Sequence, residues 1–231
     1  MRLSNECWIN DRCKKFSVQN CAQTPQYCIK LFKLNDLYDK ALFTEDQRKY
    51  VDLRIDADGT DREAFLKLKD IQSNIEQFVE KGNNLYIHST TTGNGKTRWC
   101  LRLVQMYFDK IWHKSDLVCR GLYINVPRFL LALKNSISHY DEYVEHIREN
   151  VLNADIVIWD EIGTKTATEF EHEHLLSLIN TRIDANKCNL YTSNLSGESL
   201  KEKIGDRLYS RIVNNSTTIE FFGRDKRGLN K

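Results

Sequence analysis

The stretch from Gly93 to Thr97, Gly-Asn-Gly-Lys-Thr, combines the residue types that hold a nucleotide phosphate. Two glycines allow backbone conformations in which successive N–H groups point at one anion. Lys96 would reach the β- and γ-phosphates, and Thr97 would offer its hydroxyl to Mg²⁺. The full motif, G-x-x-x-x-G-K-[ST], requires its first glycine where this chain has Thr90. We expect this threonine to restrict the backbone without removing a ligand.

The alternative for this stretch is a glycine turn beside an unrelated lysine. The order of strand, loop and helix around it favours the phosphate loop, because the helix N-terminus then points at the bound anion. The residues expected to contact ATP are those of the loop and the first helical turn: Thr92, Gly93, Asn94, Gly95, Lys96, Thr97 and Arg98.

Two neighbouring carboxylates, Asp160 and Glu161, follow the apolar run of residues 156–159. In a parallel sheet, ligands bind at the carboxyl ends of the strands. Asp160 would then hold Mg²⁺ together with Thr97, and Glu161 would orient and deprotonate the water that attacks the γ-phosphate. An acidic turn is common by itself, but one that follows a phosphate loop in this order favours an ATPase.

Asn194 ends a later apolar run and is a candidate for binding the attacking water or the γ-phosphate; a helix-capping role explains it equally well. Arg207 and Arg211 lie four residues apart and therefore on one helix face. They would neutralise phosphate charge on a neighbouring subunit, or form a solvated helix face. Basic residues near the end, among them Arg227, would sense nucleotide, touch DNA or form a basic tail.

The elements that must position these residues are short apolar runs separated by helical patterns. The runs predict strands at 84–89, 121–126, 155–160, 189–194 and 217–222, and the intervening segments predict helices, including Lys96–Trp112 and Glu169–Asp184. An earlier helical pattern runs from an N-cap at Asp61 to a stop at Gly82. Apolar strands alternating with helices indicate a parallel sheet covered on both faces.

Four of the seven cysteines lie in the first 28 residues: Cys7, Cys13, Cys21 and Cys28. A segment this short builds no core of its own, and a tetrahedral Zn²⁺ would hold it together. Their spacing has no C-x-x-C pair, and one alternative is free cysteines packed as small apolar side chains. Fe–S ligation also fits the count of four, but the sequence gives no reason to prefer it. We expect zinc here.

The composition fits a globular protein of 231 residues, with 41% hydrophobic and 29% charged residues and a net charge of +2. No apolar run approaches the roughly 20 residues that cross a membrane, and the N-terminus has no signal-peptide layout. A cytoplasmic protein without a membrane partner is therefore expected. The segment 127–152 mixes basic and aromatic residues, which suits single-stranded DNA, with acidic residues that fit an ordinary surface helix pair equally well.

The ordered set of phosphate loop, acidic strand end, "YTSN", "GDRLYSRI" and "GRDKR" resembles the DnaC/DnaI-type helicase loaders of the AAA+ group, most closely the phage-encoded members. The resemblance covers residues from about 76 to 231. It implies an AAA+ P-loop core with a five-stranded parallel sheet and no separate lid at 76–231. It also implies a small cysteine-rich and helical domain at 1–75 that binds a partner.

Residue by residue, the resemblance implies roles for each motif. Lys96 and Thr97 match the Walker A residues, Asp160 and Glu161 the Walker B pair, and Asn194 the sensor-1 position. Arg211 matches the arginine finger, with Arg207 as a second candidate, and Arg227 matches the sensor-2 arginine. The segment Pro127–Leu152 falls where the group contacts single-stranded DNA.

The function implied is an ATP-dependent loader that assembles on ATP binding and engages a hexameric DnaB-type replicative helicase and single-stranded DNA. Hydrolysis would release it. Two alternatives share the core: an adaptor in which ATP is structural, and a transposition-regulator ATPase that binds duplex DNA.

Overall fold

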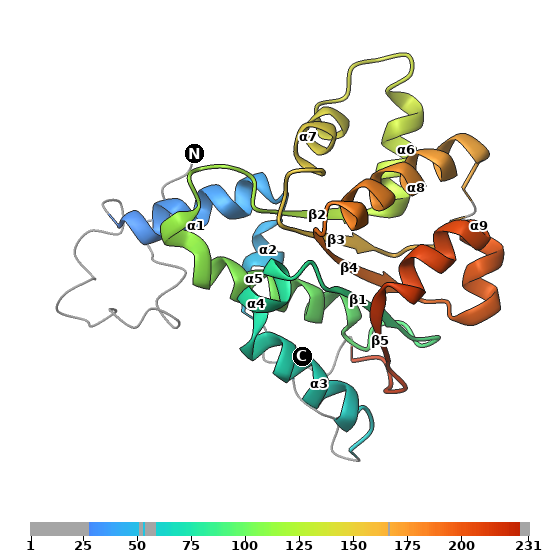
Figure 1. Cartoon of the computed structure of the whole chain (residues 1–231), viewed down its shortest axis with the longest axis horizontal. Coiled ribbons are helices and arrows are strands. Elements are labelled where there is room, and N and C mark those ends of the chain that lie inside the picture. Colours follow the sequence, from blue (N-terminus) through green and yellow to red (C-terminus); the bar gives the residue numbers. More distant parts are fainter. Residues whose placement is uncertain (1–27, 51–52, 54–58, 166, 227–231) are drawn as a thin grey trace.

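The computed structural model describes residues 28–50, 53, 59–165 and 167–226. A five-stranded parallel sheet lies at its centre, with strand order β2-β3-β4-β1-β5 (Figure 1). The strands are β1 Asn84–His88, β2 Gly121–Asn125, β3 Ile156–Asp160, β4 Cys188–Ser193 and β5 Ser216–Glu220. This confirms the expected parallel sheet, with strand limits that differ from the prediction by one or two residues.

Alternate residues of the strands supply two separate hydrophobic clusters, one on each face of the sheet. Leu85 and Ile87 of β1 join one cluster, whereas Tyr86 between them joins the other. This follows from the pleat, which turns successive side chains to opposite faces. Every residue of β1, β3 and β4 is buried, as expected for strands covered on both sides.

Helices cover both faces (Figure 1). One cluster includes residues of α1 Ile29–Lys40, α3 Arg62–Ser73, α4 Ile75–Glu80 and α5 Lys96–Ile111. The other includes residues of α6 Val126–Asn135, α7 Glu142–Asn150, α8 Glu169–Asp184 and α9 Gly197–Asn214. The short α2, Glu45–Arg48, packs against α5. None of the helices in the described part is long and apolar enough to cross a membrane.

The helical pattern before β1 forms two helices that meet at Asn74, where one had been expected. Gly82 ends the second one with φ of 64°, as predicted. Asp61 is the N-cap residue of α3, as predicted, and its carbonyl accepts from the Phe65 N–H. Its side chain makes no capping hydrogen bond, and its backbone is left-handed. The Asp61 carboxylate instead accepts hydrogen bonds from the backbone N–H groups of Phe222 and Gly223, at 2.7 and 2.9 Å.

The helices that precede residue 76 share a hydrophobic cluster with the sheet. Leu34 and Leu37 of α1 and Leu68 of α3 are fully buried in the cluster that contains Phe108 of α5. The described part of residues 1–75 therefore packs directly on the α5 side of the core, and the division at 75/76 stays a prediction.

Arg182 of α8 is fully buried and ties three parts of the chain together. Its guanidinium donates to the carbonyls of Val151, Ala154 and Cys188 and to the side-chain oxygen of Asn189, at 2.5 to 2.8 Å. All four acceptors are neutral, and burial lowers the pKa of Arg182 to about 10. The side chain thus fixes the end of α7 and the start of β4 against α8.

Replacing Arg182 with Met should destabilise the fold without touching the phosphate loop. We expect the free energy of unfolding in urea to fall by about 3 kcal/mol or more, because each buried acceptor left unpaired costs about 1–3 kcal/mol. Arg148→Met, which removes an exposed ion pair with Glu145, is the control and should cost under about 1 kcal/mol. Equal unfolding midpoints for the two variants would contradict this assignment.

Candidate functional site: a phosphate loop facing two carboxylates

The loop between β1 and α5 has the backbone geometry that its sequence predicts. Gly93 and Gly95 have φ of 73° and 103°, values that side chains disfavour. Thr90 is exposed and does not have a positive φ, so the missing first glycine leaves no strain at this position. Ser89 braces the turn by accepting hydrogen bonds from the Thr91 N–H at 3.1 Å and the Asn94 amide at 2.7 Å.

Lys96 begins α5 and its side chain is buried against the loop. Its ammonium group donates to the Thr91 carbonyl at 2.9 Å and to the Asn94 side-chain oxygen at 3.2 Å. The loop, the first turn of α5 and the ends of β3 and β4 line one cleft, made of Gly93, Asn94, Gly95, Lys96, Thr97, Arg98, Glu161, Thr192, Ser193 and Asn194. The structure thus brings most of the predicted residues together.

Asp160 is the centre of a hydrogen-bond network at the end of β3. Its carboxylate accepts from the hydroxyls of Thr97 at 2.8 Å, Thr192 at 2.6 Å and Tyr123 at 2.8 Å. Burial raises the pKa of Asp160, and these three hydrogen bonds act in the opposite direction. Thr97 and Asp160, the two residues predicted to serve Mg²⁺, are therefore in direct contact, and their role as metal ligands stays a prediction.

Glu161 lies beside Asp160 in a left-handed conformation with φ of 64°, which is uncommon outside glycine. Its N–H donates to the Thr192 hydroxyl at 3.0 Å, and the Asn125 amide donates to its carboxylate at 3.0 Å. Asn125 also caps α6 by accepting from the Arg128 N–H. The end of β2 thus holds the carboxylate of Glu161, and the end of β4 holds its backbone N–H.

Tyr123, Asn125 and Thr192 were missed by the sequence reasoning. Each lies at or near the carboxyl end of β2 or β4, and both strands pair with β3. The sequence predicts that these residues lie near strand ends, but it does not predict which strands lie beside β3. Strand order is therefore the information that was lacking.

Two other predicted residues of the cleft have different surroundings. Asn194 follows β4 and lines the cleft together with Lys96 and Thr97, as its proposed role requires. The guanidinium of Arg98 pairs with the Asp46 carboxylate at 2.7 Å, which ties α2 to the start of α5. A nucleotide contact by Arg98 stays a prediction.

Arg207 and Arg211 do not line this cleft. They are exposed on α9 and line a groove against α8, together with Leu176, Asn180, Asp206 and Ser210. The two side chains share one groove, as their spacing predicts. Their placement suits contact with another molecule better than contact with the phosphate loop of the same chain.

The segment after β5 reaches the phosphate loop. The Lys226 N–H donates to the Gly93 carbonyl at 3.0 Å, and the Asp225 carboxylate lies in the space that a side chain at position 93 would fill. Arg227, the predicted sensor arginine, lies outside the described residues. Lys226, the residue before it, contacts the phosphate loop.

The predicted zinc ligands are mostly outside the described part of the chain. Cys28 precedes α1 and is half-buried, whereas Cys7, Cys13 and Cys21 are not among the described residues. Within residues 28–50, 53, 59–165 and 167–226, no cluster of three or more His, Cys, Asp or Glu side chains forms a metal site. The zinc prediction is not tested by this result.

The residues present fit a magnesium-bound triphosphate. Mg²⁺ takes one or two protein oxygens and completes its shell with phosphates and water. The Thr97 hydroxyl and the Asp160 carboxylate supply such oxygens beside Lys96, at a helix N-terminus where backbone N–H groups favour phosphate. This cleft can therefore hold a nucleotide and present Glu161 to its terminal phosphate.

Part of this sequence is similar to known proteins. The replicative helicase loader DnaC of Escherichia coli strain K12 is 24% identical over 156 residues, which are 64% of this chain and 60% of the relative. The chain therefore spans about 60% of the length of the curated relatives it matches. The protein of Shigella flexneri with the same name matches equally.

Solved structures show the same fold at lower identity. A crystal structure of the DnaC helicase loader is 16% identical and covers 74% of this chain and 93% of that chain, with a TM-score of 0.57. DnaI is 19% identical, with coverages of 80% and 94% and a TM-score of 0.57. AMPPCP-bound DnaA from Aquifex aeolicus is 18% identical, with coverages of 76% and 49% and a TM-score of 0.53. These likenesses confirm the expected AAA+ core fold.

The pattern of the bacterial DnaA ATPase domain matches residues 61–218, from the start of α3 into β5. The match includes the phosphate loop, both carboxylates and the two arginines of α9. Together with the similarity to DnaC, this match confirms the resemblance to the DnaC/DnaI group. Since the match covers more than half of the sequence, this chain belongs to the bacterial DnaA ATPase domain family.

Proposed function

We propose that this protein is an ATP-dependent loader of a replicative helicase. The observation that carries the proposal is the direct contact of Thr97 with Asp160, with Glu161 held beside them in the phosphate-loop cleft. Similarity to the helicase loader DnaC supplies the replication role. Such a protein would act in the cytoplasm.

The geometry of the loop supports ATP binding. Backbone N–H groups ahead of Lys96 would surround the β-phosphate, and the Lys96 ammonium group would leave its loop acceptors for phosphate oxygens. Thr97 and Asp160 would hold Mg²⁺, which supplies neutralising charge for the β- and γ-phosphates. The C-terminal segment at Gly93 would have to adjust when nucleotide enters.

Hydrolysis would use Glu161 as general base. Its carboxylate orients a water molecule and takes its proton while the water oxygen bonds to the γ-phosphorus and the bond to the β-phosphate oxygen breaks. Asn125 fixes the orientation of the carboxylate by donating to it. Asn194, which lines the same cleft, would bind the same water or the γ-phosphate.

The arginines of α9 would act between subunits. A cation placed near the γ-phosphate neutralises charge that develops in the transition state. Arg207 and Arg211 are exposed in a groove of their own, so a neighbouring copy of the chain is the natural recipient. ATP binding would accordingly favour an oligomer, and hydrolysis would depend on it.

The segment of α6 and α7 is the proposed contact to single-stranded DNA. Tyr140, between the helices, is 82% exposed and lies in a surface hollow with Lys134 and His139. An exposed ring beside basic groups suits base stacking together with phosphate contacts. The N-terminal cysteine region would bind the helicase, with Zn²⁺ held by Cys7, Cys13, Cys21 and Cys28.

Lys96→Ala and Glu161→Gln should separate binding from hydrolysis. We expect Lys96→Ala to abolish ATP binding measured by calorimetry, because the buried cation at the loop is lost. Glu161→Gln should bind ATP like the wild type and hydrolyse it on the order of 10²- to 10⁴-fold more slowly. Wild-type turnover in Glu161→Gln would contradict the role of Glu161.

Asn125→Asp tests whether the amide of Asn125 positions Glu161. Aspartate keeps the helix cap of α6 but repels the Glu161 carboxylate. We expect ATP still to bind, the melting temperature to fall slightly because of this repulsion, and hydrolysis to slow on the order of 100-fold. In the Glu161→Gln background the same change should add nothing, and an additive loss would show that Asn125 acts elsewhere.

Binding to a DnaB-type helicase tests the replication role. The full-length protein with Mg²⁺ and a non-hydrolysable ATP analogue should retain the helicase in a pull-down, and single-stranded DNA should raise the ATPase rate. Glu161→Gln should retain the helicase without releasing it. Full loading activity by Glu161→Gln would instead favour an adaptor in which ATP is structural, and capture of a transposase but not of the helicase would overturn the proposal.

A further inference from the structure

The helix α9 is bent at Gly205, which has φ of 76° and ψ of 157°. This region of backbone space is open essentially to glycine alone. The bend divides the helix into residues 197–204 and 206–214 and leaves carbonyls at the end of the first half without helical partners. Both proposed arginines lie after the bend, so its geometry sets the direction in which they point.

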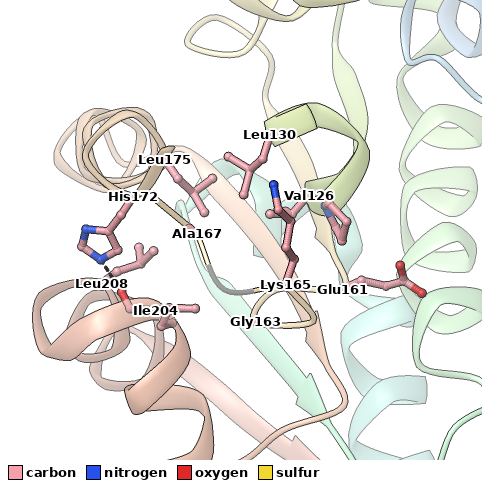
Figure 2. Close-up of a pocket in the computed structure, with 11 residues that line it drawn as sticks. Val126, Leu130, Glu161, Gly163, Lys165, Ala167, His172, Leu175, Ile204 and Leu208 are labelled. Atoms are coloured by element: carbon pink, nitrogen blue, oxygen red, sulfur yellow. Dashed lines mark hydrogen bonds between the residues drawn. The ribbon is translucent and has the colours of Figure 1, made fainter. Parts of the chain in front are cut away.

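His172 contacts this bend from α8. Its ring nitrogen Nε2 forms a hydrogen bond with the Ile204 carbonyl, drawn as a dashed line in Figure 2. A side chain at position 205 would come within 3.0 Å of the same nitrogen, so the ring occupies the space that Gly205 leaves. Because a carbonyl only accepts, Nε2 carries the proton in this contact.

The first turn of α8 holds His172 firmly. Thr168 and Glu171 form a reciprocal capping box, and the buried Glu171 carboxylate pairs with Lys165 at 3.0 Å. The histidine therefore projects from a fixed point.

A small hollow lies between the bend, α6 and the loop after β3, with Glu161 at one side and His172 at the other (Figure 2). Interiors normally fix neighbouring elements by close packing. Ile204 and Leu208 are buried and border this hollow, and the contact of His172 adds a polar anchor for the bend.

The face of α8 that carries His172 also borders the groove of the two arginines. His172, Leu176 and Asn180 are spaced by four residues and lie on one helix face. Leu176 and Asn180 line the groove of Arg207 and Arg211. The Asn180 side-chain oxygen is buried and has no hydrogen-bond partner within the described residues. This face of α8 thus supports the second half of α9 from the bend onward.

We propose that His172 is a positioning residue for Arg207 and Arg211: through the Ile204 carbonyl it sets the direction of α9 after Gly205, and so places the arginines for a neighbouring subunit. This inference rests on the proposed function, in which the arginines of one subunit act at the nucleotide site of the next. Loss of the contact would misplace the arginines, and a shift of about 1 Å in a catalytic group costs on the order of 100-fold in rate.

Mixing two variants of the protein shows whether a loss of ATPase activity comes from a subunit's own nucleotide site or from the arginines that it presents to its neighbour. Arg207→Ala/Arg211→Ala retains its own nucleotide site, and Glu161→Gln retains its arginines. Each should be slow alone, and their mixture should recover ATPase activity. We expect the double variant His172→Ala/Glu161→Gln to rescue the arginine-deficient protein on the order of 100-fold less well than Glu161→Gln does. His172→Ala with intact Glu161 should be rescued by Glu161→Gln, because its nucleotide site is unaffected.

Two further variants complete the design. His172→Gln/Glu161→Gln should restore rescue, because the glutamine amide can donate to the Ile204 carbonyl. His174→Ala/Glu161→Gln, which alters a histidine of α8 that stacks on Phe170, should rescue fully. Equal rescue by His172→Ala/Glu161→Gln and Glu161→Gln would overturn the role of His172, as would failure of Glu161→Gln to rescue His172→Ala. If the mixture of Arg207→Ala/Arg211→Ala with Glu161→Gln recovers no activity, the proposal that these arginines act on a neighbouring subunit would instead be overturned.

Discussion

The structure of the site depends on one buried carboxylate, that of Asp160. Three hydroxyl groups, from Thr97 of α5, Thr192 of β4 and Tyr123 of β2, donate to it. A carboxylate removed from water is unfavourable unless donors replace the lost hydration. These donors stabilise the charge and also hold the phosphate-loop helix against three adjacent elements. The charge that would hold Mg²⁺ is therefore also a fixed point of the fold.

Strand order explains why the remaining groups converge. In the sheet, β4 lies between β1, which precedes the phosphate loop, and β3, which ends in Asp160. Residues at the carboxyl end of β4 can therefore reach both, and Thr192 contacts Asp160 and the backbone of Glu161. On the other side of β3, β2 ends in Asn125, which holds the Glu161 carboxylate. The left-handed backbone at Glu161 is kept by these contacts, a strain common at functional sites.

The sequence was sufficient for the strands, the alternating helices and the pair of Asp160 with the phosphate loop, because these depend on local pattern and on the edge where parallel strands end. It was insufficient where distant segments meet. Asp61 looked like an ordinary helix cap, yet its carboxylate binds the chain after β5. The bend at Gly205 and its partner His172 lie 33 positions apart and have no local signature. The cysteine cluster and Arg227 stay predictions, since most of those residues lie outside the described part.

The central claim is that the cleft between Lys96 and the carboxylates binds Mg·ATP although Thr90 replaces a glycine. The most direct test is a calorimetric titration of the folded, full-length protein with Mg·ATP, combined with its melting temperature in the same buffer. The account predicts saturable heat and a melting temperature that rises with nucleotide, since a ligand that binds only the folded state stabilises it. No heat and no thermal protection, in protein shown to be folded, would contradict it.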